Sequence, residues 1–126
     1  MTALDTAEIR RKTAELLRQR GWIRDDYIAD SGSPMECKLC MVEAIGQAAG
    51  LPPLSLCNAR RRAAMQHDPV LKEQYQAMIN TIIELATALG QPKTSIQTPM
   101  DWLLDWNDDA ARTVEEVLAA LEGQAV

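Results

Sequence analysis

The chain has no phenylalanine, a single histidine and only 4% aromatic residues among its 126 positions. Its core must therefore be built from Leu, Ile, Val, Ala and Met, and the small and unbranched members of this set lose little freedom in helices. No apolar run approaches the roughly 18–20 residues that a membrane-spanning helix needs. The N-terminus lacks the basic start and apolar stretch of a secretion signal. We therefore expect a cytoplasmic helical protein with no membrane association.

Recognisable catalytic patterns are also missing. There is no P-loop, no dinucleotide glycine motif, no HExxH and no Ser/His/Asp ordering. The net charge of −5 is uneven, because residues 1–62 carry ten basic and eight acidic side chains whereas residues 63–126 carry three and ten. An acidic chain neutralises few phosphates, so nucleic acid is an unlikely partner. Three cysteines without a secretory signal indicate reduced thiols.

Capping signals divide the chain into helices. Asp5 and Gly21 bound a helix of about residues 6–20, and Ser33-Pro34-Met35-Glu36 predicts the start of a second one, which ends near Ala49. Further helices are expected over about residues 55–66 and 69–89, of which the second is the longest and is predicted to be the central, most buried one. The pattern predicts an all-α, single-domain bundle of five to six helices over residues 1–126, with little or no sheet.

The last quarter of the chain carries the strongest local signals. Thr98, followed by proline, opens a short helix that carries two tryptophans four residues apart on one face. Asn107 is interpreted as the stop of that helix, because asparagine tolerates the left-handed conformation. Thr113 and Glu116 then form a capping box that opens the last helix. The segment predicts two helices joined by a tight corner.

Three short motifs are spread over residues 8–125: Gly21-Trp22, the Cys-x-x-x-Ala-Ile segment Cys40–Ile45, and Trp106-Asn107-Asp108 followed by Thr113 and Glu116-Val117. Together they resemble a family of small, uncharacterised proteins found mainly in actinobacteria and their phages. The chain departs from the family pattern in having Glu43 where a glycine is expected and in its additional Cys37. The resemblance implies a fold and a regulatory or accessory role, and it implies no activity.

The Cys37-Lys-Leu-Cys40 element has two open interpretations. In a helix that begins at Ser33, both thiols fall on the apolar stripe, which predicts that they pack in the core. Alternatively, Cys37, Cys40, Cys57 and His67 supply three thiolates and an imidazole, the ligand set of a closed structural zinc site. An iron–sulfur centre usually needs a fourth cysteine. A redox pair is disfavoured because neither thiol is expected at a helix N-terminus.

Charged clusters give weaker predictions. Arg60, Arg61 and Arg62 fan over about 200° of a helix, so they form either a solvated face or, with Arg10-Arg11-Lys12, a basic surface for phosphates or an acidic partner. The four aspartates between residues 101 and 109 are interpreted as helix-capping groups, with a divalent cation as the alternative.

The function that best fits these features is a non-enzymatic interaction module that binds another protein or itself. The helix of residues 69–89 has more apolar residues than one buried face needs, and Val70 and Ile83 are the candidates for an exposed patch. The alternative is a metal- or thiol-dependent protein that uses Cys37, Cys40 and Cys57.

Overall fold

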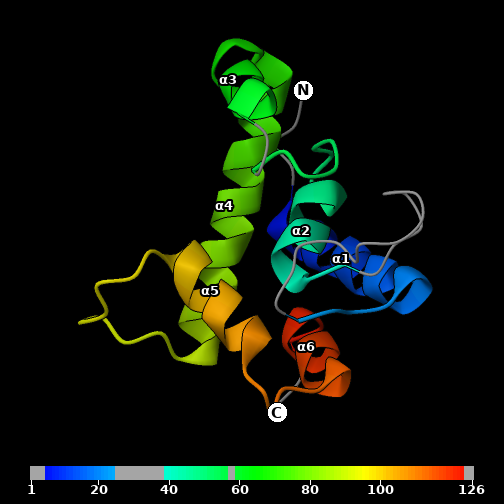
Figure 1. Cartoon of the computed structure of the whole chain (residues 1–126), viewed down its shortest axis with the longest axis vertical. Helices are drawn as coiled ribbons and strands as arrows, with labels where there is room; N and C mark the ends of the chain where they lie inside the picture. Colours follow the sequence, from blue (N-terminus) through cyan, green and yellow to red (C-terminus); the bar gives the residue numbers. More distant parts are fainter. Residues whose placement is uncertain (1–4, 25–38, 57–58, 124–126) are drawn as a thin grey trace.

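A computed structural model describes residues 5–24, 39–56 and 59–123. In these residues there are six helices and no strand, which confirms the expected all-α class (Figure 1). Their only β-type pairing is an isolated bridge between Trp22 and Leu39. The helices are α1 (Thr6–Arg20), α2 (Met41–Ala48), α3 (Ala59–His67), α4 (Pro69–Leu89), α5 (Pro99–Asp108) and α6 (Val114–Leu121).

The predicted capping residues set most helix ends. The Asp5 side chain accepts from the Ala7 N–H at the start of α1, and Gly21 ends that helix at φ 90°. Asp68 and Gly90 bound α4 in the same way, with Gly90 in the left-handed conformation at φ 103°. These ends depend on neighbouring residues only, so the sequence contains the information that fixes them.

The predicted helix from Ser33 to Ala49 is wrong at Leu39 and Cys40, which precede the observed helix. Leu39 is extended and exchanges hydrogen bonds with Gly21 and Ile23 (Leu39 N to Gly21 O and Ile23 N to Leu39 O, each 3.0 Å), so the chain is not helical there. Helix α2 begins only at Met41, with Cys40 as its N-cap residue. Ser33-Pro34-Met35-Glu36 and Cys37 lie outside the described residues. The long-range pairing with the chain after α1 outweighs the local helix signal.

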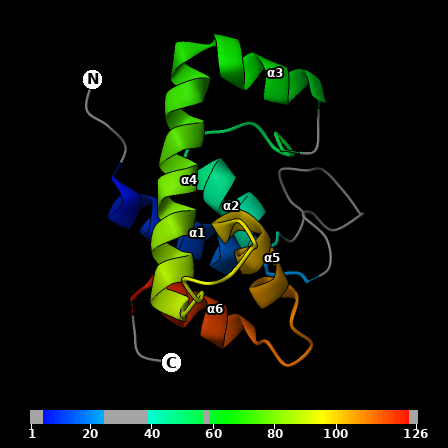
Figure 2. The same cartoon turned by 90° about the vertical axis from the view of Figure 1, so that its left-hand side faces the viewer.

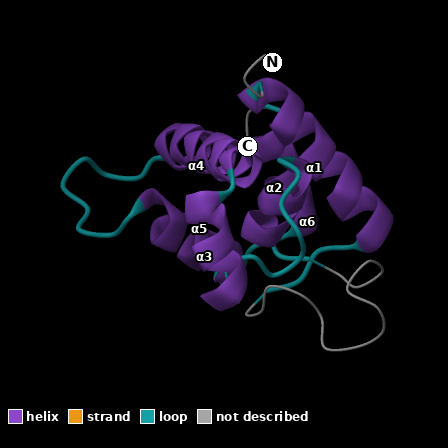
Figure 3. Ribbon diagram, turned by 90° about the horizontal axis from the view of Figure 1, so that it is seen from above, coloured by secondary structure: helices purple, strands orange, loops and turns teal. Residues whose placement is uncertain are grey.

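Helix α4 contacts all five other helices, as expected of a central helix, but the most buried helix is α2 and not α4. Every residue from Met41 to Gly46 is buried, and α2 contacts α1, α4 and α5 (Figure 3). A side chain on Gly46 would place its Cβ 3.3 Å from the sulfur of Met78, so the small residue permits the close approach of α2 and α4. Helix α4 is the longest but buries only one face, because it lies along the side of the bundle.

Helix α3 lies across the N-terminal end of α4 and is exposed except for Met65 (Figure 2). Helix α5 packs against α4 further along the same helix, and the 90–98 loop between them projects from the bundle (Figure 1). None of the helices in the described ranges is long and apolar enough to cross a lipid bilayer.

Candidate functional site

The side chain of Asn107 is the centre of a buried polar cluster. Its Oδ1 atom accepts from the indole Nε1 of Trp22 at 2.6 Å and from the backbone N of Met41 at 3.1 Å. Its Nδ2 atom donates to the carbonyl of Ile23 at 3.3 Å and to Asp108 at 2.9 Å. The residue has no exposed surface, and both lone pairs and both protons of its amide are used. This cluster ties α5 to the end of α1 and the start of α2.

Asn107 therefore has a different role from the helix stop that the sequence suggested. It lies inside α5, which ends one residue later at Asp108. The next residue, Asp109, has φ −57°, so no left-handed residue closes this helix. Local pattern rules missed the role because three of the four partners of the amide are 66 to 85 positions away in the chain.

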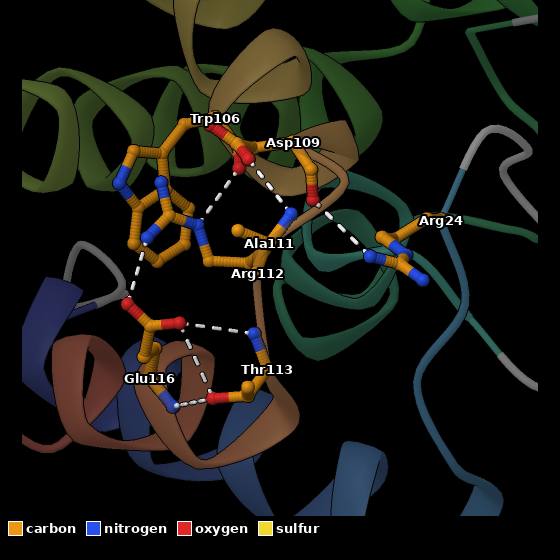
Figure 4. A network of polar contacts seen from close by, with 7 residues as sticks. All are labelled: Arg24, Trp106, Asp109, Ala111, Arg112, Thr113 and Glu116. Carbon is orange, nitrogen blue, oxygen red and sulfur yellow. Dashed lines mark hydrogen bonds and ion pairs between the residues drawn. The ribbon is translucent and has the colours of Figure 1, made fainter.

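The α5–α6 corner is held by Arg112 (Figure 4). Its guanidinium lies 3.8 Å from the centre of the Trp106 ring, and its Nε atom donates to the Trp106 carbonyl at 2.9 Å. Its Nη1 atom donates to Glu116 at 2.9 Å. The Thr113 backbone N–H, followed by the charge and hydrogen bond of Arg112, lowers the pKa of Glu116. The predicted capping box of Thr113 and Glu116 is confirmed.

The neighbouring aspartates mostly serve the same corner. Asp109 Oδ1 accepts from the Ala111 N–H at 2.9 Å, while Arg24 donates to the backbone carbonyls of Asp109 and Ala110 (Figure 4). Earlier in α5, away from the corner, Asp105 accepts from the Gln97 amide at 2.6 Å. The polar groups at this corner thus have partners within the protein, so the corner acts as a structural element.

Cys40 packs in the core, as the apolar interpretation predicted, with 1% of its surface exposed. Its sulfur accepts from the Glu43 N–H at the N-terminus of α2, a position that ordinarily favours a thiolate. Burial and the nearby Glu43 carboxylate oppose this effect, and burial raises the pKa of the Cys40 thiol to about 12. Burial therefore favours the protonated thiol of Cys40 at neutral pH.

The zinc site stays a prediction. Cys37 and Cys57 lie outside the described residues, and His67 is the exposed last residue of α3. In the described ranges, no group of three or more His, Cys, Asp or Glu side chains could hold a metal ion.

Glu43 is a buried acid that sequence reasoning noted only as a departure from the expected glycine. Its Oε2 atom accepts from the Gln47 side chain at 2.9 Å and from the Leu54 N–H at 3.0 Å, and only 4% of the residue is exposed. Burial raises the pKa of Glu43. The carboxyl group thereby ties Leu54, on the segment between α2 and α3, to α2.

Two adjoining hollows open along one side of α4, and we call them together the α4 groove. The first, between α3 and α4, has a volume of about 520 Å³, and the second, between α4 and the start of α5, about 240 Å³. Tyr75 lines both. The first is lined mainly by Leu56, Arg62, Met65, Lys72, Tyr75 and Gln76. The second is lined mainly by Tyr75, Ile79, Ile83, Pro99 and Met100.

The arginine triplet does not act as one patch. All three side chains are exposed, but only Arg62 lines the groove. The Arg61 guanidinium donates to the carbonyl of Pro53.

Arg10 and Arg11 of α1 face carboxylates instead of joining Arg62. Arg10 lies 3.8 Å from Glu84 on α4, and Arg11 pairs with Glu8 and Glu15 on its own helix.

These features define a small helical protein with a polar-anchored core and an open groove on its longest helix. The chain belongs to the family of unknown function DUF6197, whose family model matches residues 1–125. No curated protein and no solved structure matches the chain.

Proposed function

We propose that this protein is a non-enzymatic module that binds another protein through the α4 groove. The observation that carries the proposal is that the two hollows lie on the same side of α4 and share Tyr75 as a lining residue. Lys72, Gln76, Ile79 and Ile83 line this side of α4 at i, i+4, i+7 and i+11, so they form one stripe along the helix. An elongated groove with an apolar floor is the surface that receives an amphipathic helix in other recognition modules.

The exposed apolar residues of α4 separate into two positions. Ile83 is 44% exposed and lines the groove, whereas Val70 is 51% exposed but does not. At about 100° per residue the two side chains point roughly 140° apart around α4. The exposure supports the sequence-based expectation for both residues, but they do not form one patch. Only Ile83 belongs to the proposed binding surface.

The residues of the Trp106-Asn107-Asp108 motif and Thr113 serve the fold and are not part of the proposed binding surface. Asn107, Asp108 and Thr113 form hydrogen bonds within the protein, so the proposed binding surface lies elsewhere. A regulatory or accessory role, in the cytoplasm of an actinobacterium or during phage growth, is part of the proposal. It is supported only by the resemblance noted from the sequence and by composition.

The matched pair Ile83→Glu and Val70→Glu tests the proposal. Both substitutions place the same charge on an exposed position of α4, and far-UV circular dichroism verifies that both variants are folded. Proteins retained from host lysate on immobilised wild-type chain should also be retained by Val70→Glu and lost from Ile83→Glu. The assignment of the groove is contradicted if the retained proteins bind wild type, Val70→Glu and Ile83→Glu equally. It is also contradicted if both variants lose the same proteins.

A further inference from the structure

We infer that the partner of the α4 groove is an acidic amphipathic helix of another protein, with carboxylates at one end of its apolar stripe. This inference rests on the proposed function and adds the chemistry of the partner. It follows from three features of the groove: the sign of its charges, their lack of internal partners, and their separation from the apolar end.

The charges that line the groove are of one sign. Arg62 and Lys72 line the hollow between α3 and α4, and in the described part of the chain no carboxylate lines either hollow. A basic or neutral polar partner would leave these two cations without a counter-charge at the contact. Carboxylates on the partner would supply charge-assisted hydrogen bonds at that position.

Neither cation has an ion-pair partner within residues 5–24, 39–56 and 59–123. Other arginines do: Arg10 faces Glu84, Arg18 pairs with Glu122, and Arg112 pairs with Glu116. The groove cations are therefore available to a bound molecule without first breaking an internal bridge.

The two ends of the groove differ in polarity. The α3 end has the cations together with Gln76, whereas the α5 end has Ile79, Ile83, Pro99 and Met100. From residue 72 to residue 83, α4 rises about 16 Å, the length of about three helical turns. A partner helix of that length would place apolar side chains between α4 and α5 and its acids against Arg62 and Lys72.

The net charge of −5 limits the strength of this attraction. At long range the protein repels an acidic partner, so the recognition must act at the contact and not through steering. Exposed ion pairs contribute little each, so we expect a loss of affinity of about 5-fold for each reversed cation. Added salt should weaken the binding of the acidic partner, because salt screens the exposed ion pairs at the contact.

A pair of labelled peptides tests the inference. Each is a capped helix of about 18 residues with the same leucine stripe at i, i+3, i+4 and i+7, and the flanking charges are all Glu in one and all Lys in the other. Fluorescence anisotropy against the full chain should show that the Glu peptide binds at least about 10-fold tighter than the Lys peptide. The double variant Arg62→Glu/Lys72→Glu should reverse this preference.

Two further variants locate the contact. Arg60→Glu reverses a charge on α3, the helix that carries Arg62, but outside the groove. It should therefore leave the preference for the Glu peptide unchanged. Ile83→Glu should abolish binding of both peptides.

Each contrary result has a defined meaning. Equal binding of the two peptides, with loss on Ile83→Glu, overturns the acidic-partner inference and leaves the proposed function standing. Failure of both peptides to bind also overturns the inference, and the lysate capture then decides the proposed function separately. Peptide binding that is unaffected by Ile83→Glu removes the groove as the site. Light scattering that shows a dimer, dissociated by Ile83→Glu, identifies a second copy as the occupant and overturns the inference.

Discussion

Replacing Asn107 by alanine should destabilise the protein more than the Thr113→Ala or Asn80→Ala substitution does. The substitution leaves the Trp22 indole N–H and the Met41 backbone N–H without their acceptor, and the Ile23 carbonyl without a donor. An unsatisfied buried polar group costs about 1–3 kcal/mol. Only the Met41 bond is fully buried, and the partly buried Trp22 and Ile23 groups can recover some hydration, so we predict a loss of about 4 kcal/mol in the free energy of unfolding and not the full sum.

Urea unfolding measures this loss. Far-UV circular dichroism follows the helices. Tryptophan fluorescence follows Trp22, Trp102 and Trp106, of which Trp22 donates to Asn107 and Trp106 precedes it. Asn80→Ala is the matched control, because Asn80 is an exposed helical asparagine that accepts only from the neighbouring Gln76 side chain. The control should lie within about 0.5 kcal/mol of wild type. A loss below about 1 kcal/mol for Asn107→Ala would refute the reasoning, since the amide would then be replaceable by water.

The isosteric variant Asn107→Asp separates the donor role from the acceptor role. The introduced carboxylate keeps an acceptor for Trp22 and Met41 but faces the Ile23 carbonyl and the Asp108 carboxylate, where the amide had donated. Burial and these neighbours should raise the pKa of the introduced acid. An acid whose pKa is raised on folding contributes most stability when protonated, so this variant should lose stability as pH rises. A loss independent of pH would contradict the geometry.

Three further predictions concern single groups. Because the pKa of Glu43 is raised on folding, its favourable contribution is full at low pH and is lost as pH rises through the raised value. Glu43→Gln should therefore flatten the stability-against-pH curve above about pH 4, and urea midpoints at several pH values show whether it does. In a Cys37→Ser/Cys57→Ser variant, Cys40 should react with a thiol reagent only as fast as the protein unfolds, so rapid labelling of the native state would contradict its burial. Thr113→Ala removes the capping box and should cost about 1 kcal/mol by the same unfolding assay.

Local signals in the sequence predicted the helices whose ends depend on nearby residues. Asp5, Asp68, Thr98 and Thr113 each cap the helix that follows them, and each lies at the expected position. The start of α2 was missed because Leu39, two residues before it, pairs with Gly21 and Ile23, far away in the chain. A capping rule reads only neighbouring positions, so it could not detect this competing partner.

The candidate site was predictable only in part. The excess of apolar residues on the 69–89 helix pointed to Ile83, which the structure places in the groove. The selection of Arg62 from the arginine triplet was not predictable, because it depends on how α3 crosses the end of α4. The burial of α2 also could not be derived from helix length, since this short helix buries every residue from Met41 to Gly46, the acid Glu43 included.

The fold and the proposed binding surface use different residues, and this separation has a measurable consequence. Asn107 acts in the interior between α5 and α2, whereas Ile83 and Arg62 line the groove and are exposed. If the wild-type free energy of unfolding is about 6 kcal/mol, an Asn107→Ala variant that loses about 4 kcal/mol is still about 97% folded at 25 °C. Its affinity for a groove partner should therefore be almost that of wild type, while Ile83→Glu should keep the stability and lose the binding. If folded Asn107→Ala protein no longer binds the groove partner, the buried Asn107 cluster also shapes the groove. Folding stability and partner binding would then depend on the same residues.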